Sequence, residues 1–280
     1  MAEYANLGLS STPLADGERI GTRTYEITVS VGGTLEAYLT GLSLAERNSI
    51  VGGSLAFLNG LDPYDAEKTW SGDSNHCWAG ASANMLAYTG WGNVNGFQTE
   101  DDIYRYISAN FTNVAGNSLY ANEWFITGNY AQQGLAGWAQ PRYTGAGGFH
   151  PDTNYRDIAG YATIRSVTGL TSAVNKLKEG AAVSLTIGWY NSPTGLNRSG
   201  GHLITMWGAV YDTTLSPTDN GYYVSLLVSD SDDSRPGGPN APNVLTSLSI
   251  EWVSASVAPY LFTSYTLGNH GRLEDYVYLD

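Results

Sequence analysis

The sequence predicts an α+β protein in which helices precede a mostly antiparallel sheet. A helical pattern ends at Gly90, and three strand-like runs follow at 181–190, 202–211 and 222–229. The chain has 280 residues, of which 42% are hydrophobic and 14% charged, and this is enough to bury a full core. We therefore expect one large, well-packed domain with decorations rather than a disordered chain.

The charge balance limits the classes of partner. The net charge is −13, from 26 acidic and 13 basic residues. Nucleic acids and anionic membranes are bound through Lys and Arg, so neither is an expected partner. The apolar runs fall short of the ~18–20 residues that a membrane span needs, and the N-terminus lacks the pattern of a signal peptide. We therefore predict no nucleic-acid binding and no membrane insertion.

The first sixty residues carry no catalytic constellation. Residues 1–18 have the composition of an irregular arm, and the alternation of apolar and polar residues over 23–31 predicts a strand. From 35 to 61 the spacing of apolar residues is compatible with helix. We expect residues 1–60 to form an N-terminal extension and residues 61–280 to form the main domain.

The clearest helix begins after Ser74–Asn75, either of which can cap it, and it stops at Gly90. A second helix is predicted over 99–110, with Thr99 as its cap and acidic residues in the first turn. The middle of the chain, 112–168, has little periodicity and is expected to hold long loops with short elements.

The C-terminal half has the pattern of a sheet. A short helix is predicted over 171–179, where Gly180 ends it, and the three strand-like runs follow. Further apolar runs near 248–253, 260–267 and 275–279 indicate that the sheet continues.

The single cysteine, Cys77, excludes an intramolecular disulfide and a thiolate-rich zinc site. It lies in the first turn of the clearest helix, where unpaired N–H groups and the helix dipole lower the pKa of a thiol. Such a position is typical of a nucleophile, although an isolated cysteine is as often a small buried hydrophobe.

A thiolate nucleophile needs a base, usually histidine, and the chain has four. His76 adjoins the cysteine, and neighbouring side chains on a helix point about 100° apart, so His76 is poorly placed to act as the base. His150 and His270 lie in glycine-rich loop sequence without a patterned acid. His202 opens a strand after two glycines, so it is the preferred base.

An acid for that base follows from strand pairing. The runs 202–211 and 222–229 flank turn residues, which indicates an antiparallel hairpin. A register centred on Ser216 pairs position 202 with position 230, so Asp230 would orient the imidazole of His202. The residues alone thus suggest a triad of Cys77, His202 and Asp230, provided that the register holds.

Two other features carry weaker signals. The acidic stretch DSDDSRPGGPNA, which begins at Asp230, lacks the glycine and glutamate of a calcium-binding EF-hand loop, so no metal site is predicted. Lys68 is one of only three lysines in the chain and has no other distinguishing pattern.

Three segments resemble the streptococcal immunoglobulin-degrading cysteine endopeptidases, the IdeS/Mac family of papain-like proteases. They are KTWSGDSNHCWAGASANMLAY at 68–88, GHLITMWGAVYD at 201–212 and VSDSD at 228–232. Their order matches the family, and each is centred on a different catalytic role. The resemblance implies a papain-like fold, in which a helix with the cysteine at its N-terminus packs on a mostly antiparallel sheet that bears the histidine and the aspartate.

The resemblance also implies roles for five residues. Cys77 would be the nucleophile, His202 the base and Asp230 the acid of the triad. Asp232 would be a second supporting acid near the histidine. Lys68 would help the backbone N–H of the cysteine to stabilise the oxyanion, because it is a cation placed where negative charge develops.

The expected function is therefore a cysteine endopeptidase that acts on a protein or peptide substrate without a cofactor. The resemblance implies a secreted or cell-surface bacterial protein that acts on host proteins such as immunoglobulin. One alternative keeps the triad but transfers or deamidates acyl groups, because fold does not choose among these reactions. Another is an adhesion or binding module without catalytic activity, in which the Tyr- and Trp-rich middle binds a host molecule.

Overall fold

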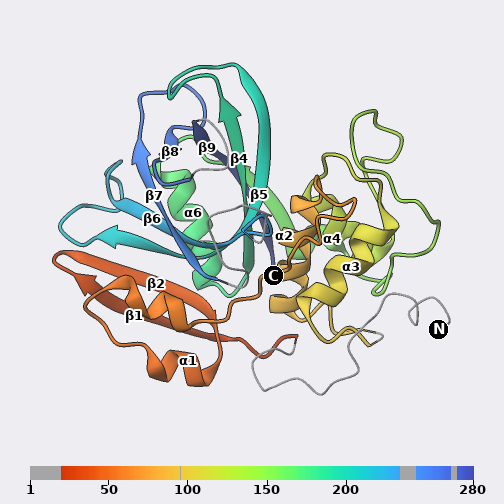
Figure 1. The fold of residues 1–280 in the computed structure, drawn as a ribbon, viewed down its shortest axis with the longest axis horizontal. Helices are drawn as coiled ribbons and strands as arrows, with labels where there is room; N and C mark the ends of the chain where they lie inside the picture. Colours follow the sequence, from red (N-terminus) through yellow and green to blue (C-terminus); the bar gives the residue numbers. More distant parts are fainter. Residues whose placement is uncertain (1–19, 95, 234–243, 266–269) are drawn as a thin grey trace.

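The fold comes from a computed structural model that describes residues 20–94, 96–233, 244–265 and 270–280. A sheet-rich part lies beside a group of helices, α2 to α4 (Figure 1). The irregular arm expected at 1–18 lies outside the described residues. In these described ranges, no helix is both long enough and apolar enough to cross a membrane.

Six antiparallel strands close into a barrel. Their order around the barrel is β5, β4, β9, β8, β7 and β6, and β6 pairs again with β5. The strands are β4 (Ala182–Tyr190), β5 (Arg198–Asp212), β6 (Tyr223–Ser229), β7 (Thr246–Trp252), β8 (Tyr260–Phe262) and β9 (Gly271–Leu279).

The predicted fold class is therefore wrong. We expected an α+β fold of papain-like type, with a helix packed on a mostly antiparallel sheet. The described chain is instead mostly sheet, its helices are few, and the central sheet closes on itself. Closure depends on β5, which pairs with β4 through its first half and with β6 through its second half. The local hydrophobic pattern predicts strands but not which edges meet.

The N-terminal hairpin extends this sheet. Strand β1 (Tyr25–Gly32) pairs with β2 (Leu35–Leu42), and β2 pairs with β5. The helix expected over 35–61 is wrong for β2, and only α1 (Leu44–Ser49) and a 3-10 turn, η2 (Leu55–Gly60), are helical there. Both faces of β2 are buried, so the alternation that marks a strand is missing.

The remaining elements surround the barrel. Helices α2 (Cys77–Thr89) and α3 (Glu100–Asn110) lie where the sequence predicts them, and Thr99 caps α3. Helix α4 (Ser118–Thr127) lies within the expected loop region and pairs with α2. The other elements are α5 (Tyr155–Ile158), β3 (Ala159–Thr163), which pairs with β9, and α6 (Val167–Lys178), which begins earlier than predicted because Ser166 caps it.

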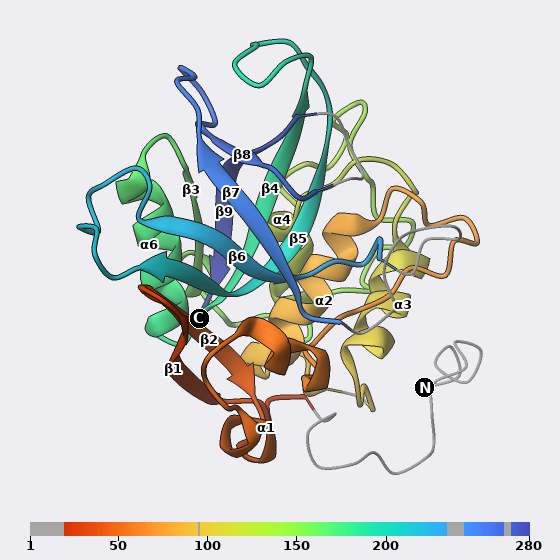
Figure 2. The ribbon, with the colours of Figure 1, turned by 60° about the vertical axis from the view of Figure 1, so that its left-hand side comes forward.

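Strand β5 divides its side chains between two cores. Leu203 and Trp207 pack with the helices α2, α3 and α4 outside the barrel. Ile204 and Met206 pack inside the barrel with α6. Figure 2 shows α6 on one side of the strands and α2 and α3 on the other. The run is continuously apolar because both faces of the strand are covered.

The predicted register of the β5–β6 hairpin is also wrong. Thr205 pairs with Ser229 and Met206 with Val228, and irregularities interrupt the ladder further along. The predicted pairing of position 202 with 230 is thus displaced by two residues. The side chain of Asp230 nevertheless reaches His202, because this residue lies just beyond the last strand residue, Ser229, where the chain turns.

Candidate active site

Cys77 is the first residue of α2, and its neighbour His76 is the N-cap. The cap thus lies one residue later than Ser74–Asn75, where we predicted it. His76 is buried and bonded through Nδ1 to the Ser108 hydroxyl at 2.7 Å and through Nε2 to the Thr112 carbonyl at 3.2 Å. Burial lowers the pKa of His76, so it is a neutral anchor for the start of the helix.

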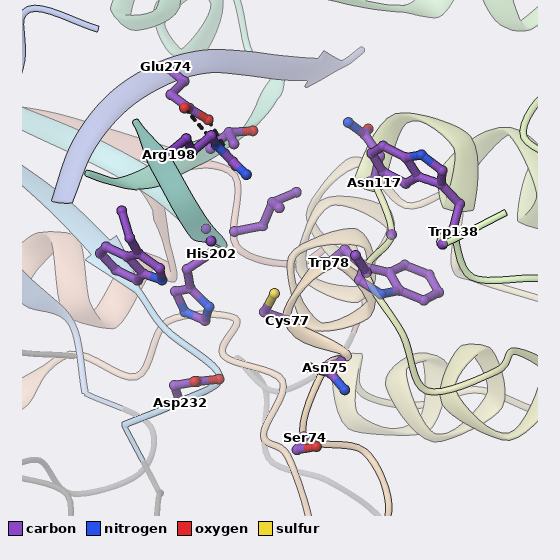
Figure 3. Close-up of a pocket in the computed structure, with 18 of the residues that line it drawn as sticks. Ser74, Asn75, Cys77, Trp78, Asn117, Trp138, Arg198, His202, Asp232 and Glu274 are labelled. Atoms are coloured by element: carbon purple, nitrogen blue, oxygen red, sulfur yellow. Dashed lines mark hydrogen bonds and ion pairs between the residues drawn. The ribbon is translucent and has the colours of Figure 1, made fainter. Parts of the chain in front are cut away.

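His202 and Asp230 form a short ion pair. His202 Nε2 lies 2.6 Å from Asp230 Oδ1, and both residues are buried. Since Nε2 is engaged, Nδ1 is the ring nitrogen that remains for Cys77. Figure 3 shows Cys77 Sγ directed toward the imidazole of His202.

These three groups shift one another's pKa values. Burial alone would raise the pKa of Cys77, but the charge and hydrogen bond of His202 and the charge of Lys68 outweigh it, and the pKa falls below its ordinary value. Burial alone would lower the pKa of His202, but Asp230 and Cys77 raise it well above the usual range. The favoured state is thus a thiolate beside an imidazolium.

Asp230 is held from a second side by an aromatic residue. Burial would raise its pKa, but His202 and its hydrogen-bond donors lower it below the usual value. Tyr265 donates its hydroxyl to Asp230 Oδ2 at 2.5 Å, and the backbone N–H of Asp232 donates to Oδ1 at 3.0 Å. The Tyr265 ring lies nearly parallel to that of Trp189, 5.5 Å away at 15°. This layer covers the ion pair and orients the carboxylate.

Lys68 and Asp232 form a second ion pair at the same place. The Lys68 ammonium also donates to the Ser74 carbonyl at 3.0 Å, just before Cys77 in the chain. The side chain of Asp232 therefore holds Lys68, while its backbone supports Asp230. The five residues singled out from the sequence lie together in one site.

Helix α2 is fixed against the segment that carries the acid. Asn84 accepts from the Ala66 N–H at 2.8 Å and donates to the Ser229 hydroxyl at 3.3 Å. Gly80 lies so close to Ser231 that an added Cβ would stand 2.9 Å from the Ser231 Cβ. Only glycine allows this approach without a shift of the chain.

A cleft of about 730 Å³ opens over Cys77. Trp78, Asn117 and Trp138 line one side, while His202 and the Arg198–Glu274 ion pair line the other (Figure 3). A cleft of this size is typical of a substrate site. Its walls come from both the helical part and the barrel.

The sequence did not point to Tyr265 or Trp189. Both lie in apolar runs that predicted strands, where an aromatic residue is expected for packing alone. His150 and His270 lie outside the cleft lining. The Nε2 of His150 bonds the Trp91 carbonyl at 3.1 Å, which accounts for this histidine structurally.

No protein-family model matches the chain, and a search of curated proteins finds no significant match.

Proposed function

We propose that the protein is a cysteine peptidase. The observation that carries the proposal is the placement of Cys77, at the first residue of a buried helix, beside a histidine that is ion-paired to Asp230. A lowered thiol pKa and a raised imidazole pKa are what a nucleophile and its acid–base partner require. The cleft above Cys77 gives a substrate access to the sulfur.

In this proposal the Cys77 thiolate attacks a peptide carbonyl and forms a C–S bond. The negative charge moves to the carbonyl oxygen, which the backbone N–H of Cys77 and the ammonium of Lys68 stabilise. That N–H is a donor because the first N–H groups of a helix have no acceptor within it. His202 gives its proton to the leaving amine as the C–N bond breaks. Water, deprotonated by His202, then hydrolyses the thioester.

The resemblance of the three segments to the streptococcal immunoglobulin-degrading endopeptidases supports the same reaction. We propose on this ground that the protein is a secreted or cell-surface virulence protease of that family, with host proteins such as immunoglobulin as substrates. Residues 1–60 remain a proposed extension to the main domain.

The test uses the single cysteine as its own reporter. The full chain is reacted with iodoacetamide from pH 4 to 9, and the mass of the adduct is followed over time. We expect fast alkylation that persists well below the ordinary thiol pKa of ~8.5 and is lost in His202→Ala. Slow alkylation that follows an ordinary thiol titration and ignores His202 would contradict the proposal and favour a binding module.

Substrate assays then separate the hydrolase from its alternative. Wild-type protein is incubated with casein and with immunoglobulin, and Cys77→Ala is the control. Peptide fragments in the wild-type reaction alone support a peptidase. Ammonia release from glutamine side chains without cleavage would instead identify a deamidase or acyltransferase that uses the same thiolate.

A further inference from the structure

A second group of acids lies behind the active site. The carboxylates of Asp65, Glu67 and Asp233 each have an oxygen within 4.8 Å of the others. Asp65 and Asp233 are buried, at 1% and 3% exposure, and Glu67 is half-buried. Two of these residues precede Lys68 in the chain, and the third follows Asp232. The group thus joins the two segments that carry the proposed catalytic residues.

Asp65 differs from an ordinary buried carboxylate in its lack of hydrogen bonds. Both of its carboxylate oxygens are buried and accept no hydrogen bond in the described part of the chain. Leaving a buried carboxylate unpaired costs several kcal/mol, so such groups are normally paired or bound to metal. Its carboxylate points into the group of acids, and the neighbouring charges that act most strongly on it are Asp233, Glu67, Asp230 and Glu100. A cation bound among these carboxylates would supply the partner that Asp65 lacks.

We propose that Asp65, Glu67 and Asp233 bind one divalent cation, and that this cation is Ca²⁺. Carboxylate oxygens are the ligands that Ca²⁺ prefers, at 2.3–2.6 Å, so two ligands of one ion lie at most about 5 Å apart. The separation of up to 4.8 Å fits this limit. Mg²⁺ loses its water reluctantly and is usually held by only one or two carboxylates, so a group of three carboxylates suits Ca²⁺ better. Water would supply the remaining ligands of the ion.

The other acidic group of the site has a different character. His202, Asp230 and Asp232 also have ligand atoms within 4.8 Å of one another. There, however, Asp232 is paired with the Lys68 ammonium and Asp230 with the imidazole. Asp65 has no such partner among the described residues, so we assign the metal ion to its group.

The bound ion would stabilise the connection between two segments. The Ser229 hydroxyl donates to the Tyr64 carbonyl at 2.9 Å, and Lys68 pairs with Asp232. In the first segment these contacts lie on either side of Asp65 and Glu67, and in the second segment both contacts precede Asp233. The ion would therefore hold Lys68 and Asp230 in register, and its loss would loosen the proposed oxyanion and base positions together.

The binding test does not depend on enzymatic activity. The full chain is treated with EDTA, dialysed, and titrated with CaCl₂ in a calorimeter. We expect one equivalent of Ca²⁺ to bind, and MgCl₂ to bind more weakly. The melting temperature should rise by about 5 °C at a free Ca²⁺ concentration of about 100 Kd. Absence of both the binding heat and the melting shift would overturn the proposal.

A pair of variants locates the site. Asp65→Asn should weaken Ca²⁺ binding by about 100-fold and abolish the melting shift, while it folds without Ca²⁺ because it removes a buried charge. Asp152→Asn changes an exposed aspartate and should bind as the wild type does. Unchanged Ca²⁺ binding by Asp65→Asn would place the ion elsewhere and contradict the assignment.

Discussion

Two buried carboxylates in neighbouring regions of this molecule have opposite surroundings. Asp230 receives a hydrogen bond from Tyr265 and an ion pair from His202. Asp65 is surrounded by further acids and has no hydrogen bond to either oxygen among the described residues. The pKa of Asp230 is accordingly lowered and that of Asp65 is raised well above the usual value, although burial favours the neutral form in both.

Burial alone therefore says little about the state of a carboxylate. The protonation state of a buried carboxylate depends on the neighbouring charges and hydrogen-bond donors that the fold places around it. The Asp230 region is complete within the protein and is built to hold a positive imidazole. Asp65 has no hydrogen-bond donor to its carboxylate among the described residues, and in our proposal it receives a positive charge from a bound ion. Substitutions at the two positions should separate these roles.

The largest expected effect is on catalysis at Asp230. Asp230→Asn should lower kcat/KM by about 10²–10⁴-fold, because the imidazolium of His202 loses the charge that orients and stabilises it. Alkylation of Cys77 should shift to higher pH in the same variant. Steady-state kinetics and iodoacetamide labelling measure both effects, with Asp152→Asn as the control. Activity within twofold of wild type would remove Asp230 from the proposed triad.

The second effect is on stability and has opposite signs at the two carboxylates. Asp230→Asn should lower the free energy of unfolding by about 3–5 kcal/mol, because it breaks a buried ion pair and leaves His202 without its partner. Asp65→Asn, measured in EDTA, should leave this free energy unchanged or raise it by about 1 kcal/mol. Urea unfolding at pH 7 gives both values. Equal destabilisation by Asp230→Asn and Asp65→Asn would contradict the inference that only Asp230 has a stabilising charged partner.

The third effect is on the pH profile. Thiolate is the active form of Cys77, and its lowered pKa places the acid limb of kcat/KM below the ordinary value of ~8.5. Imidazolium is the active form of His202, and its raised pKa places the alkaline limb well above ~6.5. The two limbs should therefore lie closer to each other's ordinary position or cross, and activity should fall about tenfold per pH unit below the acid limb and above the alkaline limb. An acid limb near 8.5 would show that the pair is not formed.

The smallest effect is expected at Tyr265. Tyr265→Phe removes one hydrogen bond to a charged carboxylate and should lower kcat by about tenfold with little change in KM. The alkaline limb should move toward lower pH, because Asp230 then supports the imidazolium less well. A change in stability without a shift of this limb would make Tyr265 a packing residue only. Tyr143, which is exposed and lies outside the cleft lining, offers a matched control as Tyr143→Phe.

The sequence predicts which residues lie together in the cleft region better than it predicts the fold. The positions of Cys77 and His202 can be predicted because a helix start and a strand start are encoded by local residues. The prediction that Asp230 lies beside His202 depends on a hairpin register that is wrong. The hydrophobic pattern does not show the irregularities in the β5–β6 ladder. Barrel closure and the strand at Leu35–Leu42 were missed because they depend on partners far away in the chain.

The acids around Asp65 were missed for a related reason. Asp65 and Asp233 are 168 positions apart in the sequence, and no short motif connects them. Tyr265 was missed because its role depends on a carboxylate that lies 35 positions away. Contacts of this range arise only when the barrel and the helices have packed together.

The close approach of Gly80 to Ser231 has a consequence for the geometry of the proposed active site. The glycine lies three residues after Cys77, and the serine directly follows Asp230, so this contact sets the spacing between the proposed nucleophile and the proposed acid. The methyl group of an alanine at position 80 would push α2 and the segment that carries Asp230 apart. The distance between α2 and the acid segment, on which the proposed thiolate–imidazolium pair depends, therefore requires a residue without a side chain at position 80.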